Sequence, residues 1–211
     1  MRDVILAHGL WVPGVVMQPL AARLARAGFR CHVFAYSGVA RPIEAHAERL
    51  ARVARALSAD GGPAHFVGHS LGGLVILEAL QREPGIHAGR VVLLGTPAQG
   101  CFAGRRFAHF PGGRWLLGES EHLWREGRTA HWRRPEPLGV IAGTMPLGLG
   151  RLFGPLPGAN DGVVSVEETA VEGMGARALL PVGHSQMLVS ARVAKQVAAF
   201  LNKGCFNEDS R

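Results

Sequence analysis

The stretch Gly68-His69-Ser70-Leu71-Gly72-Gly73 decides the fold of this chain. Residues 64–67 before it form an apolar run typical of a buried strand, and residues 74–80 after it are typical of a mostly buried helix. A strand, a tight turn with the pattern G-x-S-x-G and a helix predict a nucleophile elbow, in which the serine stands clear of the sheet. Gly68 and Gly72 lack the Cβ that would collide with the neighbouring strand and helix. A glycine-rich turn without chemistry is the alternative interpretation.

The composition predicts a single domain over residues 1–211. Of these residues 47% are hydrophobic and 18% are charged, which allows a sizeable core. No run of 18 apolar residues is present, so no transmembrane segment is expected. The first residues lead directly into a strand-like run and do not resemble a signal peptide, which favours a cytoplasmic location. Cys31, Cys101 and Cys205 lie far apart in the chain, and this spacing predicts free thiols.

The chain is basic, with a formal net charge of +7. Its arginines fall largely at helical spacing, which is typical of a solvated helix face. Examples are Arg23, Arg26, Arg49, Arg52 and Arg55. No basic stripe alternates with aromatic residues, so nucleic-acid binding is not expected. The charge leaves open a weak attraction to an anionic membrane surface or to an acidic substrate.

Short apolar segments alternate with amphipathic ones along the rest of the chain. Further strands are expected over residues 3–7, 30–35, 90–95, 138–142 and 176–182. Further helices are expected over residues 15–27, 43–59 and 185–201. This alternation predicts an α/β fold with a mostly parallel sheet of about six strands and helices on both faces.

Residues 97–137 interrupt this alternation. They contain six large aromatic residues: Phe102, Phe107, Phe110, Trp115, Trp124 and Trp132. We interpret the segment as short helices over the carboxyl ends of the strands, forming a small cap or a wall of the substrate pocket. An ordinary surface excursion is the alternative. Residues 204–211 are expected to be a frayed tail.

A serine hydroxyl needs a base to take its proton, and that base needs an acid to orient it. After an elbow serine the expected order in the chain is acid and then histidine. Of the four aspartates, Asp161 is the one that follows Ser70 and lies outside the tail, and His184 is the one histidine after Asp161. The order therefore predicts a triad of Ser70, Asp161 and His184. Glu167 and Glu168 are the alternative acids.

Two backbone N–H groups are expected to form an oxyanion hole. One is the amide of Leu71, directly after the nucleophile. The other is the amide of Leu10, in the loop after the first strand, with Trp11 as the alternative. The substrate pocket is expected to be lined by Trp11, Met145 and Leu147.

Two histidines near this site are expected to be structural. His8 is expected to brace the oxyanion loop through hydrogen bonds. His69 is expected to pack, because its side chain points away from the serine hydroxyl across the turn. The remaining histidines lack metal-ligand spacing such as H-E-x-x-H, and no phosphate loop or dinucleotide fingerprint is present. The sequence therefore predicts neither a metal nor a cofactor.

Together these residues resemble the α/β-hydrolase superfamily, and within it the small bacterial lipases and esterases. The resemblance covers nearly the whole chain and rests on residues 6–10, 68–73, 94–97, 160–164 and 183–185. The stretch Gly95-Thr96-Pro97-Ala98-Gln99-Gly100 is similar to a lipase and GPI-inositol-deacylase pattern, but Ala98 stands where that pattern has histidine. Family members usually carry two strands before the oxyanion strand, so the resemblance implies a minimal α/β-hydrolase fold here.

The predicted function is hydrolysis of a small-molecule or lipid carboxylic ester through an acyl-enzyme on Ser70. Apolar loops over residues 10–17, 102–117 and 145–156 favour a lipophilic acyl group. Thioester or amide hydrolysis on the same triad is one alternative. A non-catalytic binding module with the hydrolase fold is the alternative from another class.

Overall fold

The protein is built around a six-stranded sheet in which every pair of neighbouring strands is parallel. The computed structural model describes residues 1–59, 62–125, 130–148 and 154–208. The strands lie in the order β2-β1-β3-β4-β5-β6. Their bounds are β1 (Arg2–Ala7), β2 (Phe29–Phe34), β3 (Ala64–His69), β4 (Ala88–Leu94), β5 (Leu138–Gly143) and β6 (Ala176–Leu180). The prediction of a parallel six-stranded sheet is confirmed.

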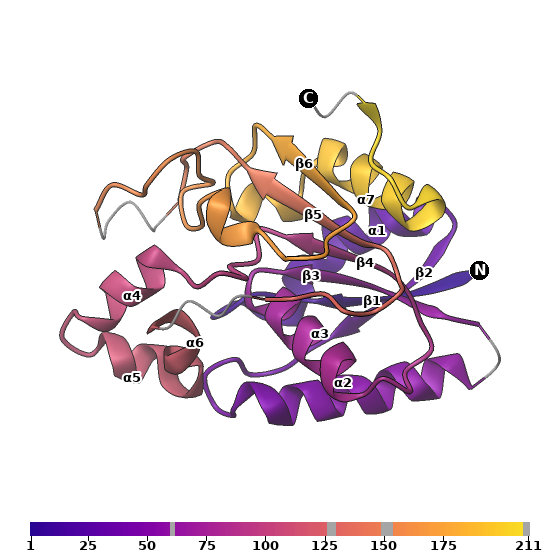
Figure 1. The fold of residues 1–211 in the computed structure, drawn as a ribbon, viewed down its shortest axis with the longest axis horizontal. Helices are drawn as coiled ribbons and strands as arrows, with labels where there is room; N and C mark the ends of the chain where they lie inside the picture. Colours follow the sequence, from indigo (N-terminus) through magenta and orange to yellow (C-terminus); the bar gives the residue numbers. More distant parts are fainter. Residues whose placement is uncertain (60–61, 126–129, 149–153, 209–211) are drawn as a thin grey trace.

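Helices cover both faces of the sheet (Figure 1). The helices α2 (Ile43–Ser58) and α3 (Leu71–Arg82) pack on one face. The helices α1 (Gln18–Arg26) and α7 (Ala191–Lys203) pack on the other. Alternate strand residues face opposite sides, so Ile5 belongs to the core under α2 and α3, whereas Leu6 belongs to the core under α1 and α7. The two cores hold the sheet between the helix layers.

Two predicted helices have different bounds in the structure. The expected helix over residues 185–201 is divided into the short helix η5 (Ser185–Leu188) and α7. The continuous helix is therefore wrong, because the hydroxyl of Ser190 accepts a hydrogen bond from the N–H of Val193 at 3.3 Å and starts α7 afresh. The expected helix over residues 15–27 begins as the short helix η1 (Gly14–Met17) before α1.

The segment over residues 97–137 forms short helices beyond the carboxyl ends of the strands, at the left of Figure 1. They are α4 (Phe102–Ala108), α5 (Gly113–Leu117), η2 (Gly118–Ser120) and α6 (Glu121–Arg125). Trp124 on α6 and Trp132 after it are buried, whereas Trp115 on α5 is exposed. Residues 126–129 of this segment lie outside the described residues.

The end of the chain is packed over most of the segment expected to be frayed. The ring of Phe206 lies 4.8 Å from the ring of Phe200 on α7. The N–H of Asn207 donates to Oε1 of Gln196 at 2.8 Å. The prediction of a frayed tail is therefore wrong for these residues, because an apolar ring and a buried amide hold them. Residues 209–211 lie outside the described part of the chain.

The three cysteines are free, as predicted. Cys101 is buried and Cys31 is partly buried, whereas Cys205 is exposed. Burial raises the pKa of the Cys31 thiol to about 11 and that of Cys101 to about 12. None of the helices in the described part of the chain is long and apolar enough to cross a membrane.

Stability is expected to fall as the pH falls from 7 to 5. Burial lowers the pKa of His65 to about 4 and that of His69 to about 3, so both stay neutral in the folded protein. In the unfolded chain they take up a proton below about pH 6.5, so the unfolded state gains stability as the pH falls. Each histidine should then lower the free energy of unfolding by about 2 kcal/mol at pH 5.

Urea denaturation at pH 7 and pH 5 measures this loss. The His65→Gln variant should lose about 2 kcal/mol less free energy of unfolding between the two pH values than the wild type, because one buried neutral histidine is removed. Equal stability of the wild type at both pH values would contradict the assignment.

Candidate active site

Ser70 stands at a strained turn between β3 and α3. Its φ is 54° and its ψ is −123°, a conformation that residues with a side chain rarely adopt. A Cβ placed on Gly68 would lie 2.5 Å from Cα of Gly73, and one placed on Gly72 would lie 2.3 Å from the carbonyl oxygen of Ala7. The turn therefore requires glycine on both sides of Ser70.

His184 and Asp161 form a buried hydrogen-bonded pair. Nδ1 of His184 donates to Oδ2 of Asp161 at 2.7 Å, and the backbone N–H of His184 donates to the Asp161 carbonyl at 2.9 Å. Both side chains are almost completely buried. Because Nδ1 carries the proton that bonds the carboxylate, Nε2 is the acceptor nitrogen of the neutral ring.

A tight turn holds the carboxylate of Asp161. Its Oδ1 accepts the N–H groups of Val163 at 2.9 Å and Val164 at 2.7 Å. Within the turn, Gly162 has a φ of 91° and donates its N–H to Oδ1 of Asn160 at 3.0 Å. The backbone thus fixes the carboxylate so that its second oxygen is left for His184.

The carboxyl end of β4 brings Ser70, which follows β3, close to Asp161 and His184, which follow β5 and β6. Ser70 donates its N–H to the carbonyl of Leu94, the last residue of β4, at 2.9 Å. The next residue is Gly95, and a Cβ placed on it would lie 2.9 Å from Oδ2 of Asp161 and 3.0 Å from Nδ1 of His184. Because Gly95 has a φ of 51° and no room for a side chain, only glycine suits this position.

His69 packs directly on His184. The two ring centroids are 4.6 Å apart, and Nε2 of His69 donates to the carbonyl oxygen of His184 at 3.1 Å. Burial lowers the pKa of His69 to about 3, so its ring is neutral. This geometry agrees with the packing role expected for His69.

His8 braces the loop that follows β1, as expected. Its Nδ1 donates to the Gly9 carbonyl at 2.8 Å, and its Nε2 accepts the backbone N–H of Tyr36 at 3.2 Å. The hydroxyl of Tyr36 donates to the His8 carbonyl at 2.7 Å, and the two rings stack at 4.5 Å. Burial lowers the pKa of His8, which keeps the ring in this neutral form. Tyr36, the single tyrosine of the chain, was not among the residues predicted for this site.

The residues predicted to form the oxyanion hole come together beside Ser70. A Cβ placed on Gly38 would lie 2.7 Å from Cδ2 of Leu71 and 3.1 Å from Cδ1 of Leu10. A Cβ placed on Gly9 would lie 3.2 Å from Cβ of Ser70. Leu71 is the first residue of α3, so its N–H has no acceptor within the helix. The loop after β1 and the start of α3 therefore flank the serine.

Trp11 connects this loop to the short helices over residues 97–137. Its Nε1 donates to the carbonyl of Leu116 at 2.8 Å, and its ring meets Phe107 edge-on at 5.2 Å. Trp11 has a φ of 59° and, with Ser70, is one of two non-glycine residues at positive φ in the described part of the chain. Such strain persists only where the surrounding contacts hold it.

Met145 and Leu147 lie beside the acid and the base. Met145 donates its N–H to the carbonyl of Val182 at 3.3 Å. A Cβ placed on Gly183 would lie 3.3 Å from Cβ of Leu147. A Cβ placed on Gly162 would lie 2.5 Å from the carbonyl carbon of Leu147. Leu147 is 53% exposed, so an apolar side chain borders the site at the surface. Residues 149–153 of this loop lie outside the described residues.

The family model that describes the Alpha/beta hydrolase family matches residues 4–196. The chain belongs to this family. A search of the curated proteins found no match to the sequence.

Solved structures of other hydrolases share the fold of this alpha/beta hydrolase. Mature lipase BlEst2 of Bacillus licheniformis has a TM-score of 0.75 at 15% identity, covering 97% of this chain and 92% of that one. The pyrethroid hydrolase PytH has a TM-score of 0.64 at 17% identity, and the match covers 96% of this chain and 98% of that one. The NocB thioesterase domain, solved as a covalent complex with a fluorophosphonate, has a TM-score of 0.58 at 15% identity, covering 96% and 94%. At these identities the likeness shows the fold alone.

Glu168, one of the two alternative acids of this alpha/beta hydrolase, has other partners. Oε2 of Glu168 accepts the N–H of Ser165 at 2.9 Å, and the N–H of Glu168 donates to the Ser165 hydroxyl at 3.3 Å. This reciprocal pair is a capping box at the short helix η4 (Glu167–Thr169). Oε1 of Glu168 also accepts the N–H of Phe102 and so holds the start of α4. The capping role of Glu168 was not predicted, although the spacing S-x-x-E of Ser165 and Glu168 is typical of a capping box.

The described residues offer no metal site near these side chains. No group of three or more histidine, cysteine, aspartate or glutamate side chains gathers as metal ligands in that part of the chain.

Proposed function

We propose that this alpha/beta hydrolase cleaves carboxylic esters with a lipophilic acyl group. The observation that carries the proposal is the buried hydrogen bond of 2.7 Å between His184 and Asp161, beside the strained turn of Ser70. A histidine with its Nδ1 proton fixed by a carboxylate presents Nε2 as a base. A serine held at an elbow turn is the nucleophile that such a base activates.

In the proposed reaction His184 Nε2 takes the hydroxyl proton of Ser70 as its oxygen attacks the ester carbonyl. The amides of Leu10 and Leu71 stabilise the negative charge that forms on the carbonyl oxygen. His184 then gives the proton to the leaving alcohol, and the acyl group remains on Ser70. Water attacks this acyl-enzyme with His184 again as the base, while Asp161 stabilises the charged imidazole. The bond between the acyl group and Ser70 then breaks, His184 returns the proton to the Ser70 oxygen, and the carboxylic acid is released.

Apolar side chains around the triad support a lipophilic acyl group. Trp11 is 56% exposed, Leu116 is 46% exposed and Leu147 is 53% exposed, and each lies in or contacts a loop beside the site. Exposed apolar groups of this size next to a nucleophile are suited to cover an alkyl chain.

A fluorophosphonate probe tests the proposal, because it reacts with an activated serine and mimics the tetrahedral intermediate. The folded protein should be labelled at Ser70, as peptide mass spectrometry would show. The rate with p-nitrophenyl octanoate should exceed that with p-nitrophenyl acetate. Folded protein that is neither labelled nor active on the two esters would support the non-catalytic binding module instead.

Hydrolysis of a matched octanoyl thioester tests the thioesterase alternative. If kcat/KM for the thioester exceeded that for the octanoyl ester, the same triad would belong to a thioesterase. A preference for acetyl over octanoyl esters would contradict the lipophilic pocket while leaving the triad in place.

A further inference from the structure

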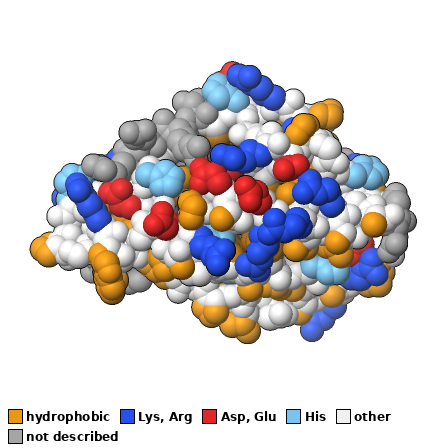
Figure 2. All heavy atoms as spheres, turned by 90° about the horizontal axis from the view of Figure 1, so that it is seen from below, with side chains coloured by type: hydrophobic (Ala, Val, Ile, Leu, Met, Phe, Trp, Pro, Cys, Tyr) orange, Lys and Arg blue, Asp and Glu red, His pale blue; other side chains and the backbone are white. Residues whose placement is uncertain are grey.

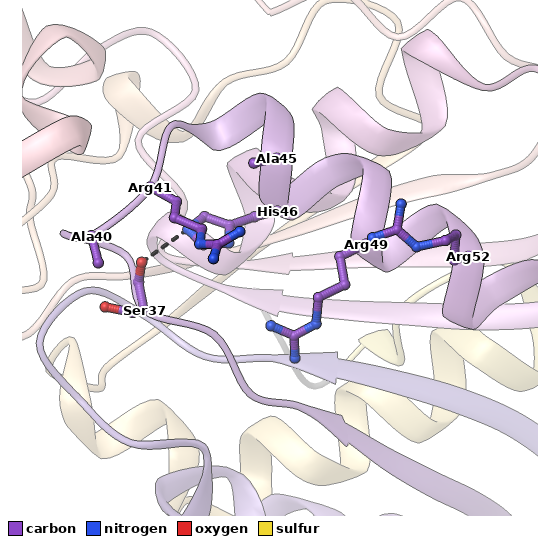
Figure 3. A pocket seen from close by; sticks show the side chains of 7 residues that line it. All are labelled: Ser37, Ala40, Arg41, Ala45, His46, Arg49 and Arg52. Carbon is purple, nitrogen blue, oxygen red and sulfur yellow. Dashed lines mark hydrogen bonds between the residues drawn. The ribbon is translucent and has the colours of Figure 1, made fainter.

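A cavity lies away from the triad, at the start of α2. Its volume is about 330 Å³, and it is lined by Ser37, Ala40, Arg41, Ala45, His46, Arg49 and Arg52 (Figure 3). The first three of these residues belong to the loop after β2, and the others lie on α2. On a helix, residues 45, 49 and 52 share one face because they are four and three positions apart. Three arginines therefore line one cavity.

The lining carries positive charge without a carboxylate. No aspartate or glutamate of the described residues lines the cavity. Figure 2 views the α2 side of the molecule and shows basic side chains gathered near the middle of this face, beside several carboxylates. Two other arginines of this side are paired: Arg55 with Glu83 at 2.8 Å, and Arg82 with Glu78. No carboxylate partner of the described residues is recorded for the three arginines of the cavity.

Two contacts hold the walls of the cavity in place. Nε2 of His46 donates to the Ser37 carbonyl at 2.9 Å and ties the loop to α2. Arg49 donates to the carbonyl of Ala35, and its guanidinium lies 4.7 Å from the ring centroid of Phe34. The side chains of Arg41 and Arg52 are exposed, and neither side chain makes a hydrogen bond or ion pair with a described residue. These two arginines are therefore available to a ligand.

We propose that this cavity binds a phosphate monoester group. Guanidinium groups bind phosphate oxygens through paired hydrogen bonds, and three positive charges suit a dianion better than a singly charged carboxylate. The volume accommodates the phosphate together with part of the group it esterifies.

The cavity is separate from the proposed catalytic site but joined to it by one loop. Gly38 of the loop after β2 lies against the side chains of Leu10 and Leu71, as described above. The phosphate could belong to a free metabolite or to the headgroup of phosphatidic acid, since both present the same dianion. The experiment below measures binding alone, so its outcome is independent of ester hydrolysis.

Binding is measured by calorimetry with glycerol 3-phosphate and by cosedimentation with phosphatidylcholine vesicles that contain or lack phosphatidic acid. The test variant is Arg41→Gln with Arg52→Gln, because neither side chain has a recorded hydrogen bond or ion pair with a described residue. The control variant, Arg26→Gln with Arg177→Gln, removes the same charge from α1 and β6, where both residues are exposed. Melting temperatures confirm that both variants fold.

The test variant should weaken binding by about tenfold or more, and the control by about twofold or less. Weaker binding of glycerol 3-phosphate would assign the site to a free phosphate ester, whereas an effect on vesicles alone would assign it to the lipid headgroup. The proposal is overturned if wild type binds neither ligand. It is also overturned if the two variants weaken binding equally, because the attraction would then be that of the overall charge.

Discussion

Replacing Ser70 with alanine is expected to lower kcat/KM for p-nitrophenyl octanoate by about 10⁵-fold. The variant has no hydroxyl oxygen to attack the ester, so the acyl-enzyme cannot form. The backbone should be unaffected, because alanine and serine have a similar steric cost at the φ of 54° that this turn imposes. Initial rates together with the melting temperature measure the two effects separately.

Ser185 provides a matched control for this change. Gly183-His184-Ser185 repeats the letters of Gly68-His69-Ser70, but Ser185 is exposed and begins the short helix η5. The Ser185→Ala variant should keep its activity within about threefold of wild type. If Ser70→Ala hydrolysed the ester at the wild-type rate, Ser70 would not be the nucleophile.

Replacing Asp161 with asparagine is expected to lower kcat by about 10⁴-fold. The asparagine oxygen can still accept the N–H groups of Val163 and Val164, which lie 2.9 and 2.7 Å from Oδ1 in the wild type. Its amide NH₂ then faces Nδ1 of His184 as a donor. The neutral imidazole then adopts the other tautomer, in which Nδ1 is the acceptor and Nε2 carries the proton. His184 therefore has no free nitrogen to act as the base for Ser70.

The two alternative acids serve as controls for Asp161. Glu167→Gln changes an exposed side chain, and Glu168→Gln changes a carboxylate that is bonded to Ser165 and Phe102. Both variants should hydrolyse the octanoyl ester within about tenfold of the wild-type rate, although the second should melt at a lower temperature. A large loss of kcat in Glu168→Gln with an active Asp161→Asn would reverse the assignment of the acid.

The strand and helix pattern was predictable because it depends on short-range features. Apolar runs of four to seven residues between glycine- and polar-rich turns indicated each strand, and β3 and β5 are completely buried, as central strands of a parallel sheet must be. The errors lie where a single side chain ends or holds a segment. Ser190 starts a new helix, and Phe206 packs on Phe200, and neither contact follows from periodicity.

The sequence by itself determined the family of folds and the order of the three candidate catalytic residues. G-x-S-x-G is a local requirement for a turn without Cβ atoms, and few aspartates and histidines follow it, so chain order left Asp161 and His184. Only the tertiary structure decided which side chains and backbone groups contact the candidate catalytic residues and the loops beside them. The contacts of Tyr36 with His8 and of Gly95 with Asp161 join segments far apart in the chain, and such contacts depend on how strands and loops pack together.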